Sequence, residues 1–117
     1  PARVRAIAPF DRIALIHGIE HFYPWEAFQL LVECTKLLAK DGILILEQPD
    51  LSKCQSKAEW IFGDPDHCSP DMLHRWGYTP DTLSDALIGA GFKRTVTKPA
   101  LFHDPKRDFR IEAYVTI

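Results

Sequence analysis

Long apolar runs are absent from this sequence of 117 residues, and the longest, such as residues 43–46, span four or five residues. A membrane-spanning helix needs about 20 consecutive apolar residues, so no such helix is predicted. No apolar stretch follows residues 1–5, and we expect no signal peptide.

A large excess of one charge is also absent, because 14 basic and 16 acidic residues give a net charge of −2. This balance argues against a strongly basic nucleic-acid-binding protein.

Cysteine is scarce, and the three residues of this type form no C-x-x-C pair. Because their number is odd, we expect no disulfide framework, and the expected location is the reducing cytoplasm. The composition, with 46% hydrophobic and 26% charged residues, is typical of a globular protein. The length corresponds to one domain that can bury a core. The cysteines are Cys34, Cys54 and Cys68.

The first half of the chain has the pattern of a βαβ unit. Residues 10–17 contain a continuous apolar run, which is typical of a parallel strand covered on both faces. Pro24 fits the first turn of a helix, and apolar residues then recur at steps of three and four. This spacing predicts a helix of about four turns that ends at Gly42. Residues 43–47 form a second continuous apolar strand, parallel to the first and ended by Pro49.

A long loop and a second helix follow. Residues 50–78 contain proline, glycine, cysteine and histidine, which predicts a loop with a short helix near residues 56–62. Thr79 is a good N-cap because proline and an acidic residue follow it, and Gly91 marks the expected end of the helix.

The last part of the chain predicts two strands. Residues 92–98 and 108–117 alternate between apolar and polar side chains. Residues 99–107 join them, so we expect an antiparallel pair. The predicted order is β-α-β-(loop)-α-β-β, an open α/β sheet whose last strand is antiparallel.

Four short motifs occur in a fixed order. They are Phe-Asp with an apolar strand and Glu-His (residues 10–22), a leucine-rich helix end with a glycine turn and a strand (37–47), a helix ending in Ala-Gly-Phe (87–92), and the start of the last strand (107–110). Together they resemble the fourth to seventh strands of class I S-adenosylmethionine (SAM)-dependent methyltransferases, over about residues 8–117. The resemblance implies half of a Rossmann-like methyltransferase sheet, SAM as cofactor, and methyl transfer to a small-molecule acceptor of unknown identity.

The cofactor-binding half of the family pattern has no counterpart in these residues. The family binds SAM with a glycine-rich loop after its first strand and an acidic residue after its second. Residues 1–9 contain neither glycine nor an acidic residue. Residues 1–117 are therefore interpreted as a single domain that resembles the C-terminal half of a methyltransferase and is incomplete on its own. The alternative is a non-catalytic homodimeric remnant or interaction module.

The missing strands have a consequence for the sheet. The family's strand order is 3-2-1-4-5-7-6, so the strand at residues 11–17 is expected at an edge. Residues 13–16 hold no proline or charge to protect such an edge. We expect this strand to pair with the same strand of a second copy about a two-fold axis, giving a homodimer. The alternative is that residues 4–8 fold back over it.

The first candidate site follows the first strand, where ligands bind in open α/β sheets. The resemblance implies that His17, Gly18 and Ile19 line the methionine end of SAM. Histidine titrates near neutral pH, so His21, with Glu20 beside it, is a candidate catalytic base for the methyl acceptor. The alternative is that Glu20 and His21 cap or tether the following helix.

Four more residues are candidates for substrate binding. His74, Trp76 and Tyr78 precede the second helix, and the resemblance implies that this segment helps to form the substrate wall. The rings of Trp76 and Tyr78 would stack on a planar substrate, or alternatively fill the core under the loop. Glu47 ends the second strand at the same edge, where it either faces the site or lies in water.

We predict no metal. His17, Glu20 and His21 resemble, more loosely, the Glu-x-x-Glu-His metal cluster of small-RNA 2′-O-methyltransferases. In this sequence His17 stands in place of the first glutamate of that motif. No H-x-x-x-H spacing supports such a site. A fourth ligand would have to come from His67, His74 or His103.

Residues 93–110 hold six basic and two acidic residues. Such a patch binds an anion or nucleic acid in some proteins, but we favour a solvated face.

Overall fold

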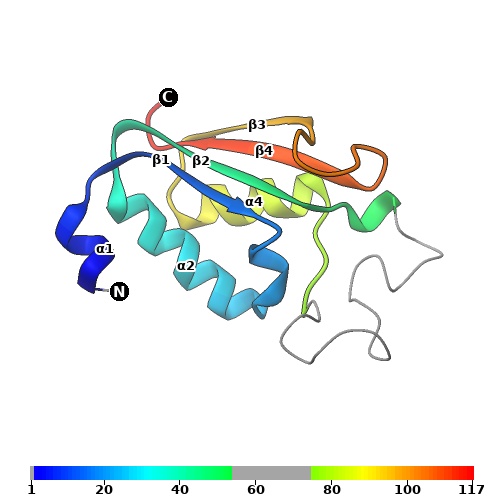
Figure 1. Ribbon diagram of the computed structural model, residues 1–117, viewed down its shortest axis with the longest axis horizontal. Helices are drawn as coiled ribbons and strands as arrows, with labels where there is room; N and C mark the ends of the chain where they lie inside the picture. The colour runs from blue at the N-terminus through cyan, green and yellow to red at the C-terminus, as the bar shows by residue number, and fades with distance from the viewer. Residues whose placement is uncertain (1, 54–74) are drawn as a thin grey trace.

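The computed structural model describes residues 2–53 and 75–117, which form a four-stranded sheet with helices packed against one face (Figure 1). In chain order the elements are α1 (Ala2–Ile7), β1 (Phe10–Ile16), the 3-10 turn η1 (Ile19–His21), α2 (Pro24–Leu37), β2 (Leu38–Pro49), η2 (Leu51–Lys53), α4 (Pro80–Ala90), β3 (Arg94–Pro99) and β4 (Asp108–Tyr114).

The sheet has the strand order β1-β2-β4-β3. β1 and β2 are parallel, whereas β4 runs antiparallel to both of its neighbours, β2 and β3. This topology confirms the predicted α/β class, the parallel βαβ unit and the final antiparallel pair. The described residues place β1 at one edge of the sheet, as expected.

Helices α2 and α4 lie side by side on the same face of the sheet (Figure 1). In β1, Asp11, Arg12 and Ala14 are exposed. The expectation that this strand is covered on both faces is therefore wrong for the described residues. Ile13 and Leu15 of β1 pack against the core and are partly buried, whereas Ala14 lies on the exposed face.

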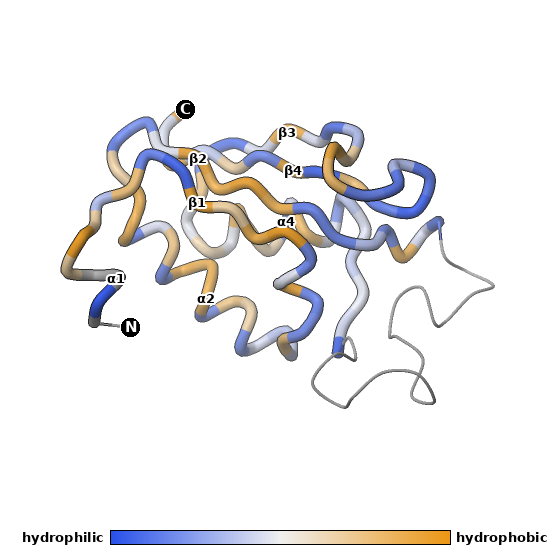
Figure 2. The backbone as a smooth tube through the Cα atoms, in the orientation of Figure 1, coloured by the Kyte–Doolittle hydropathy of each residue, from blue (hydrophilic) through white to orange (hydrophobic). Residues whose placement is uncertain are grey.

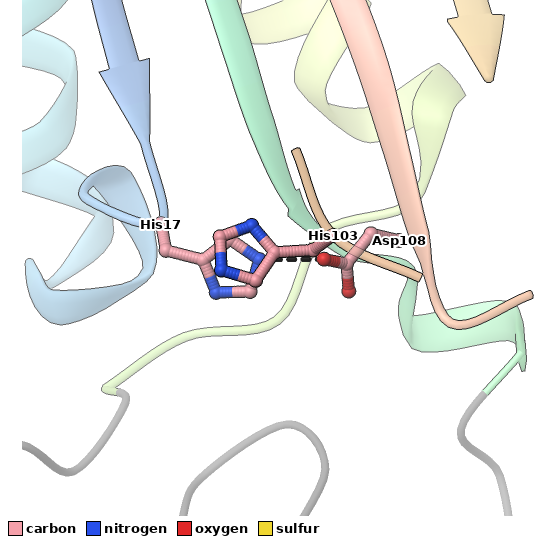
Figure 3. A group of neighbouring side chains, drawn as sticks. All are labelled: His17, His103 and Asp108. Carbon is pink, nitrogen blue, oxygen red and sulfur yellow. Dashed lines mark hydrogen bonds and ion pairs between the residues drawn. The ribbon is translucent and has the colours of Figure 1, made fainter. Parts of the chain in front are cut away.

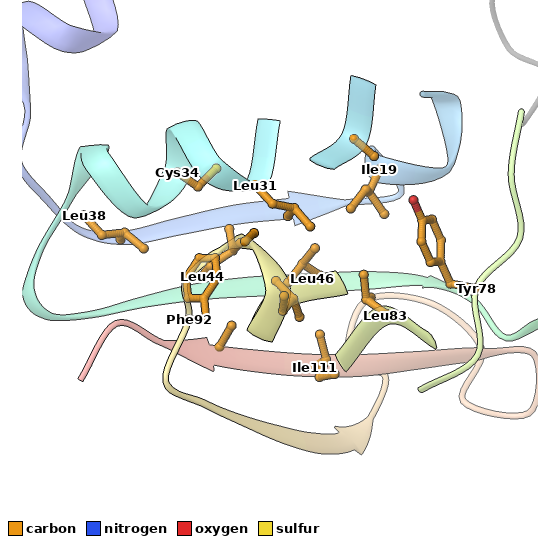
Figure 4. Packing of buried hydrophobic residues seen from close by; sticks show 14 of the residues in the cluster. Ile19, Leu31, Cys34, Leu38, Leu44, Leu46, Tyr78, Leu83, Phe92 and Ile111 are labelled. Carbon is orange, nitrogen blue, oxygen red and sulfur yellow. The ribbon is translucent and has the colours of Figure 1, made fainter. Parts of the chain in front are cut away.

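The core lies between the sheet and the two helices (Figure 4). Leu44, Leu46 and Ile111 project from the sheet and are fully buried, opposite Leu83 and Leu87 of α4. The middle of β2 is accordingly hydrophobic and its carboxyl end is hydrophilic (Figure 2). The alternating residues of β4 behave as predicted up to Ala113, but Ile117 lies beyond the strand and is 99% exposed.

The end of α2 differs from the prediction. The helix ends at Leu37, and Leu38 already has extended backbone angles and pairs with Phe10 of β1. The turn that contains Gly42 therefore lies within β2. A side chain at Gly42 would place its Cβ 2.8 Å from the carbonyl oxygen of Ala39, so glycine is needed here for close approach rather than as a helix stop.

The ends of α4 agree with the prediction. The Thr79 hydroxyl accepts a hydrogen bond of 3.2 Å from the backbone N–H of Thr82, and Gly91 follows the helix with φ of 120°.

Residues 4–7 belong to α1, which lies beyond the start of β1 near the C-terminal end of α2 (Figure 1). They do not form a strand beside β1, so the structure does not support the fold-back alternative. The helix predicted near residues 56–62 lies outside the described residues. Within residues 2–53 and 75–117, no helix combines the length and apolarity needed to cross a bilayer.

Candidate functional site

His17 is placed where β1 ends. Its backbone N–H donates a 2.7 Å hydrogen bond to the carbonyl oxygen of Glu47, which joins the carboxyl ends of β1 and β2. Its φ of 51° is in the left-handed region, which is uncommon for a residue with a side chain. This conformation turns the chain sharply out of the sheet, and the side chain is directed toward β4 (Figure 3).

Asp108, the first residue of β4, forms a hydrogen bond with the His17 side chain. The distance from His17 Nε2 to Asp108 Oδ2 is 2.5 Å, and the Asp108 side chain is fully buried. Arg107 donates from Nε to Oδ1 at 2.7 Å and from its terminal nitrogen to Oδ2 at 3.1 Å. Burial opposes ionisation of Asp108, but the hydrogen bonds and charges of His17 and Arg107 outweigh it and lower the pKa of Asp108 to about 2.

A second imidazole completes this group. His103, in the loop between β3 and β4, packs on the His17 ring with centroids 3.9 Å apart and planes tilted by 32° (Figure 3). One donor atom from each of His17, His103 and Asp108 lies within 4.8 Å of the others. Sequence reasoning missed Asp108, because only the antiparallel pairing of β4 with β2 brings this residue to His17.

Glu20 lies one turn further, in η1. The residue is 2% exposed, and neither carboxylate oxygen has a hydrogen-bond partner among residues 2–53 and 75–117. Burial raises the pKa of Glu20 to about 7, an effect that the nearby charge of His17 only partly offsets. The Glu20 carboxylate therefore does not cap α2. That helix begins with a hydrogen bond of 3.1 Å from the Tyr23 N–H to the Glu26 side chain.

The neighbours of Glu20 have different surroundings. Gly18 precedes η1 with an ordinary negative φ, and Ile19 is fully buried in the core. His21 accepts a hydrogen bond of 3.0 Å at its carbonyl oxygen from Arg75. Cofactor contact by His17, Gly18 and Ile19, and catalysis by Glu20 and His21, remain predictions.

The segment before α4 reaches the same edge of the sheet. The backbone N–H groups of Arg75 and Trp76 donate to the carbonyl oxygen of Glu20 at 2.7 and 3.3 Å. Trp76 is 46% exposed, and its role in the substrate wall stays a prediction.

Tyr78 is 5% exposed and belongs to the core (Figure 4), so its position agrees with the alternative that it fills space under the loop. Burial, and to a lesser degree the Glu20 charge, raise the pKa of Tyr78 to about 12. His74 lies outside the described residues, as do His67, Cys54 and Cys68.

Glu47 is fully buried, so the interpretation that it lies in water is wrong. Its carboxylate accepts hydrogen bonds of 3.0 Å from the N–H groups of Leu101 and Phe102 and from Arg110. Burial raises the pKa of Glu47, but these hydrogen bonds and the Arg110 charge more than offset it, and the pKa is lowered. These contacts give Glu47 the role of anchoring the loop that carries His103, and a direct contact with substrate remains a prediction.

The basic residues near the C-terminus are largely paired. Arg110 contacts Glu47 and Glu112, and Lys98 lies 2.9 Å from Glu112. Arg94 packs over the ring of Tyr114 at 4.0 Å. These contacts support a structural role for the patch.

The fold is similar to that of SAM-dependent methyltransferases of known structure. The chain matches a SAM-dependent methyltransferase from Archaeoglobus fulgidus with a TM-score of 0.66 and 18% identity, over 97% of this chain and 63% of that one. It matches an O-methyltransferase family protein from Burkholderia thailandensis with a TM-score of 0.69 and 12% identity, over 97% and 32%. Human N-acetylserotonin methyltransferase, solved in complex with SAM, matches with a TM-score of 0.64 and 16% identity, over 92% and 30%.

These similarities show that the chain has part of a methyltransferase fold. It spans less than two thirds of the length of each of these structures. Comparisons of the sequence with protein-family models and with curated proteins give no match.

Proposed function

We propose that the chain takes part in SAM-dependent methyl transfer, with the reaction at the carboxyl ends of β1 and β2. The observation that carries the proposal is the match of 92–97% of the chain to SAM-dependent methyltransferases of known structure. The candidate site lies where open α/β sheets bind ligands, and it places His17, Glu20 and Trp76 at one edge.

Glu20 is suited to accept a proton from the methyl acceptor. Methyl transfer needs alignment of the acceptor atom with the methyl group, and a base assists when the acceptor is a hydroxyl or protonated amine. Glu20 is buried, and a carboxylate with a pKa of about 7 is half-ionised at neutral pH. Glu20 therefore fits the role of general base, and the neighbouring Trp76 fits that of a wall for an apolar or planar acceptor.

A second copy of the chain is proposed to complete the site. An apolar groove of about 350 Å³ runs between β1 and α2 and is lined by Phe10, Ile13, Leu15, Leu30 and Leu37. Arg12 and Glu33 also line it. Pairing of the two β1 strands would cover both edges and make one continuous sheet.

The proposal is tested by calorimetric titration of the full chain with S-adenosylhomocysteine, the product that retains most cofactor contacts. We expect saturable binding in the micromolar range. His17→Asn is expected to weaken binding, because His17 is proposed to line the methionine end, whereas Asp85→Asn on the exposed face of α4 should leave it unchanged. Absence of heat up to millimolar ligand would overturn catalysis by this chain and favour a non-catalytic homodimeric module.

A further inference from the structure

We propose that His17, His103 and Asp108 bind one divalent transition-metal ion, with zinc as the best match. This site shares His17 with the proposed methyl-transfer site but rests on a separate observation, the grouping of three metal-ligating side chains. The three side chains come from the end of β1, the loop between β3 and β4, and the first residue of β4 (Figure 3). No other group of three or more metal-ligating side chains is found in the described part of the chain.

The donor set has the chemistry of a zinc site. Two imidazoles and one carboxylate are a ligand combination that zinc accepts, and three protein ligands leave a fourth tetrahedral position for water or another small ligand. The fully buried side chain of Asp108 supplies the carboxylate oxygen of this donor set. His103 is exposed, which gives the ion a path from solvent.

The surroundings hold the ligands in place. Arg107 Nε donates to Asp108 Oδ1 at 2.7 Å, which leaves Oδ2 as the oxygen directed at His17. A ligating carboxylate is commonly held by such a hydrogen bond. Glu47 binds the N–H groups of Leu101 and Phe102 and so fixes the chain just before His103. The left-handed backbone of His17 directs its ring to the same point.

Binding requires small movements. Zinc–ligand distances of about 2.1 Å place tetrahedral donors ~3.4 Å apart. The donor atoms now lie within 4.8 Å of one another, and His17 and Asp108 share a 2.5 Å hydrogen bond. The ion would replace the proton between these two side chains, while His103 rotates in its exposed loop. Arg107, whose terminal nitrogen lies 3.1 Å from Oδ2, would shift and lower the affinity through its positive charge.

The test is titration of the metal-free full chain with zinc by calorimetry, supported by the absorption spectrum of the cobalt-substituted protein. We expect one ion per chain with micromolar affinity and a tetrahedral cobalt spectrum without thiolate bands. His103→Asn should weaken binding at least about tenfold. Because His103 is exposed, this variant should fold, which circular dichroism checks.

His21→Asn is the matched control, since His21 lies close in sequence but outside the cluster. We expect it to bind zinc like the wild type. Absence of saturable binding by the wild type, equal binding by His103→Asn, or loss of binding in His21→Asn would each overturn the proposal. Binding of S-adenosylhomocysteine tests the proposed function separately. The His103→Asn substitution should lower the zinc affinity and leave the S-adenosylhomocysteine affinity unchanged.

Discussion

Glu47 and Arg110 face each other across β2 and β4 and form a buried ion pair, with 3.0 Å between Glu47 Oε2 and the Arg110 guanidinium. Their side chains are 0% and 10% exposed. The same carboxylate holds the backbone of Leu101 and Phe102, so one acidic side chain joins the centre of the sheet to the loop before β4.

Replacing Glu47 with glutamine is expected to lower the free energy of unfolding by about 3 kcal/mol, because it leaves the Arg110 charge buried with less compensation. Urea denaturation at neutral pH measures the change. Asp85→Asn, an exposed substitution on α4, should change stability by less than ~0.5 kcal/mol. An equally small change in Glu47→Gln would show that the pair is not important for stability.

Two glycine substitutions are expected to act in opposite directions. Gly42→Ala should cost about 1–3 kcal/mol, because its Cβ would lie 2.8 Å from the Ala39 carbonyl oxygen and 3.1 Å from two Leu38 carbons. Gly89→Ala, inside α4, should raise the free energy of unfolding by up to about 1 kcal/mol, because alanine favours a helix more than glycine does. The added Cβ would lie 3.8 Å from Phe28 Cε2, which is an ordinary contact distance. Thermal melts of the two variants compare them directly, and a Gly42→Ala protein as stable as the wild type would contradict the close approach.

The elements that depend on local signals were predicted well from the sequence. Thr79 and Gly91 mark the ends of α4 because capping is decided by neighbouring backbone groups. The end of α2 was predicted five residues too late, because Leu38 is withdrawn from the helix by pairing with Phe10, a contact between distant residues.

The candidate site was likewise predictable only where it depends on local sequence order. The sequence indicated the loop after β1, since its position depends on the order of strands and helices. The partners of His17 could not be found this way, because Asp108 is 91 positions away and reaches His17 only through the pairing of β4 with β2. The burial of Glu47 likewise depends on the loop that folds over it.

The β1 edge is expected to mediate dimerisation. Ile13 is partly buried and lines the groove between β1 and α2, so Ile13→Glu would place a charge in the proposed interface. Light scattering after size exclusion should give a dimer for the wild type and a monomer for Ile13→Glu. Ile88→Glu, on the exposed face of α4, should remain dimeric. A monomeric wild type at high micromolar concentration would contradict a second copy at this edge.

The stability of the protein is expected to fall between about pH 4.5 and 7 because of Glu20. Its pKa is raised from 4.5 to about 7 on folding, so over this range the folded state holds a proton that the unfolded state has released. The stabilisation is complete below pH 4.5 and is lost as the pH rises through 7. In Glu20→Gln this group does not titrate, so the stability of the variant relative to wild type should increase by up to ~3 kcal/mol between pH 4.5 and 8. Urea denaturation of both proteins at several pH values measures this difference, and parallel pH profiles would show that Glu20 ionises normally in the folded protein.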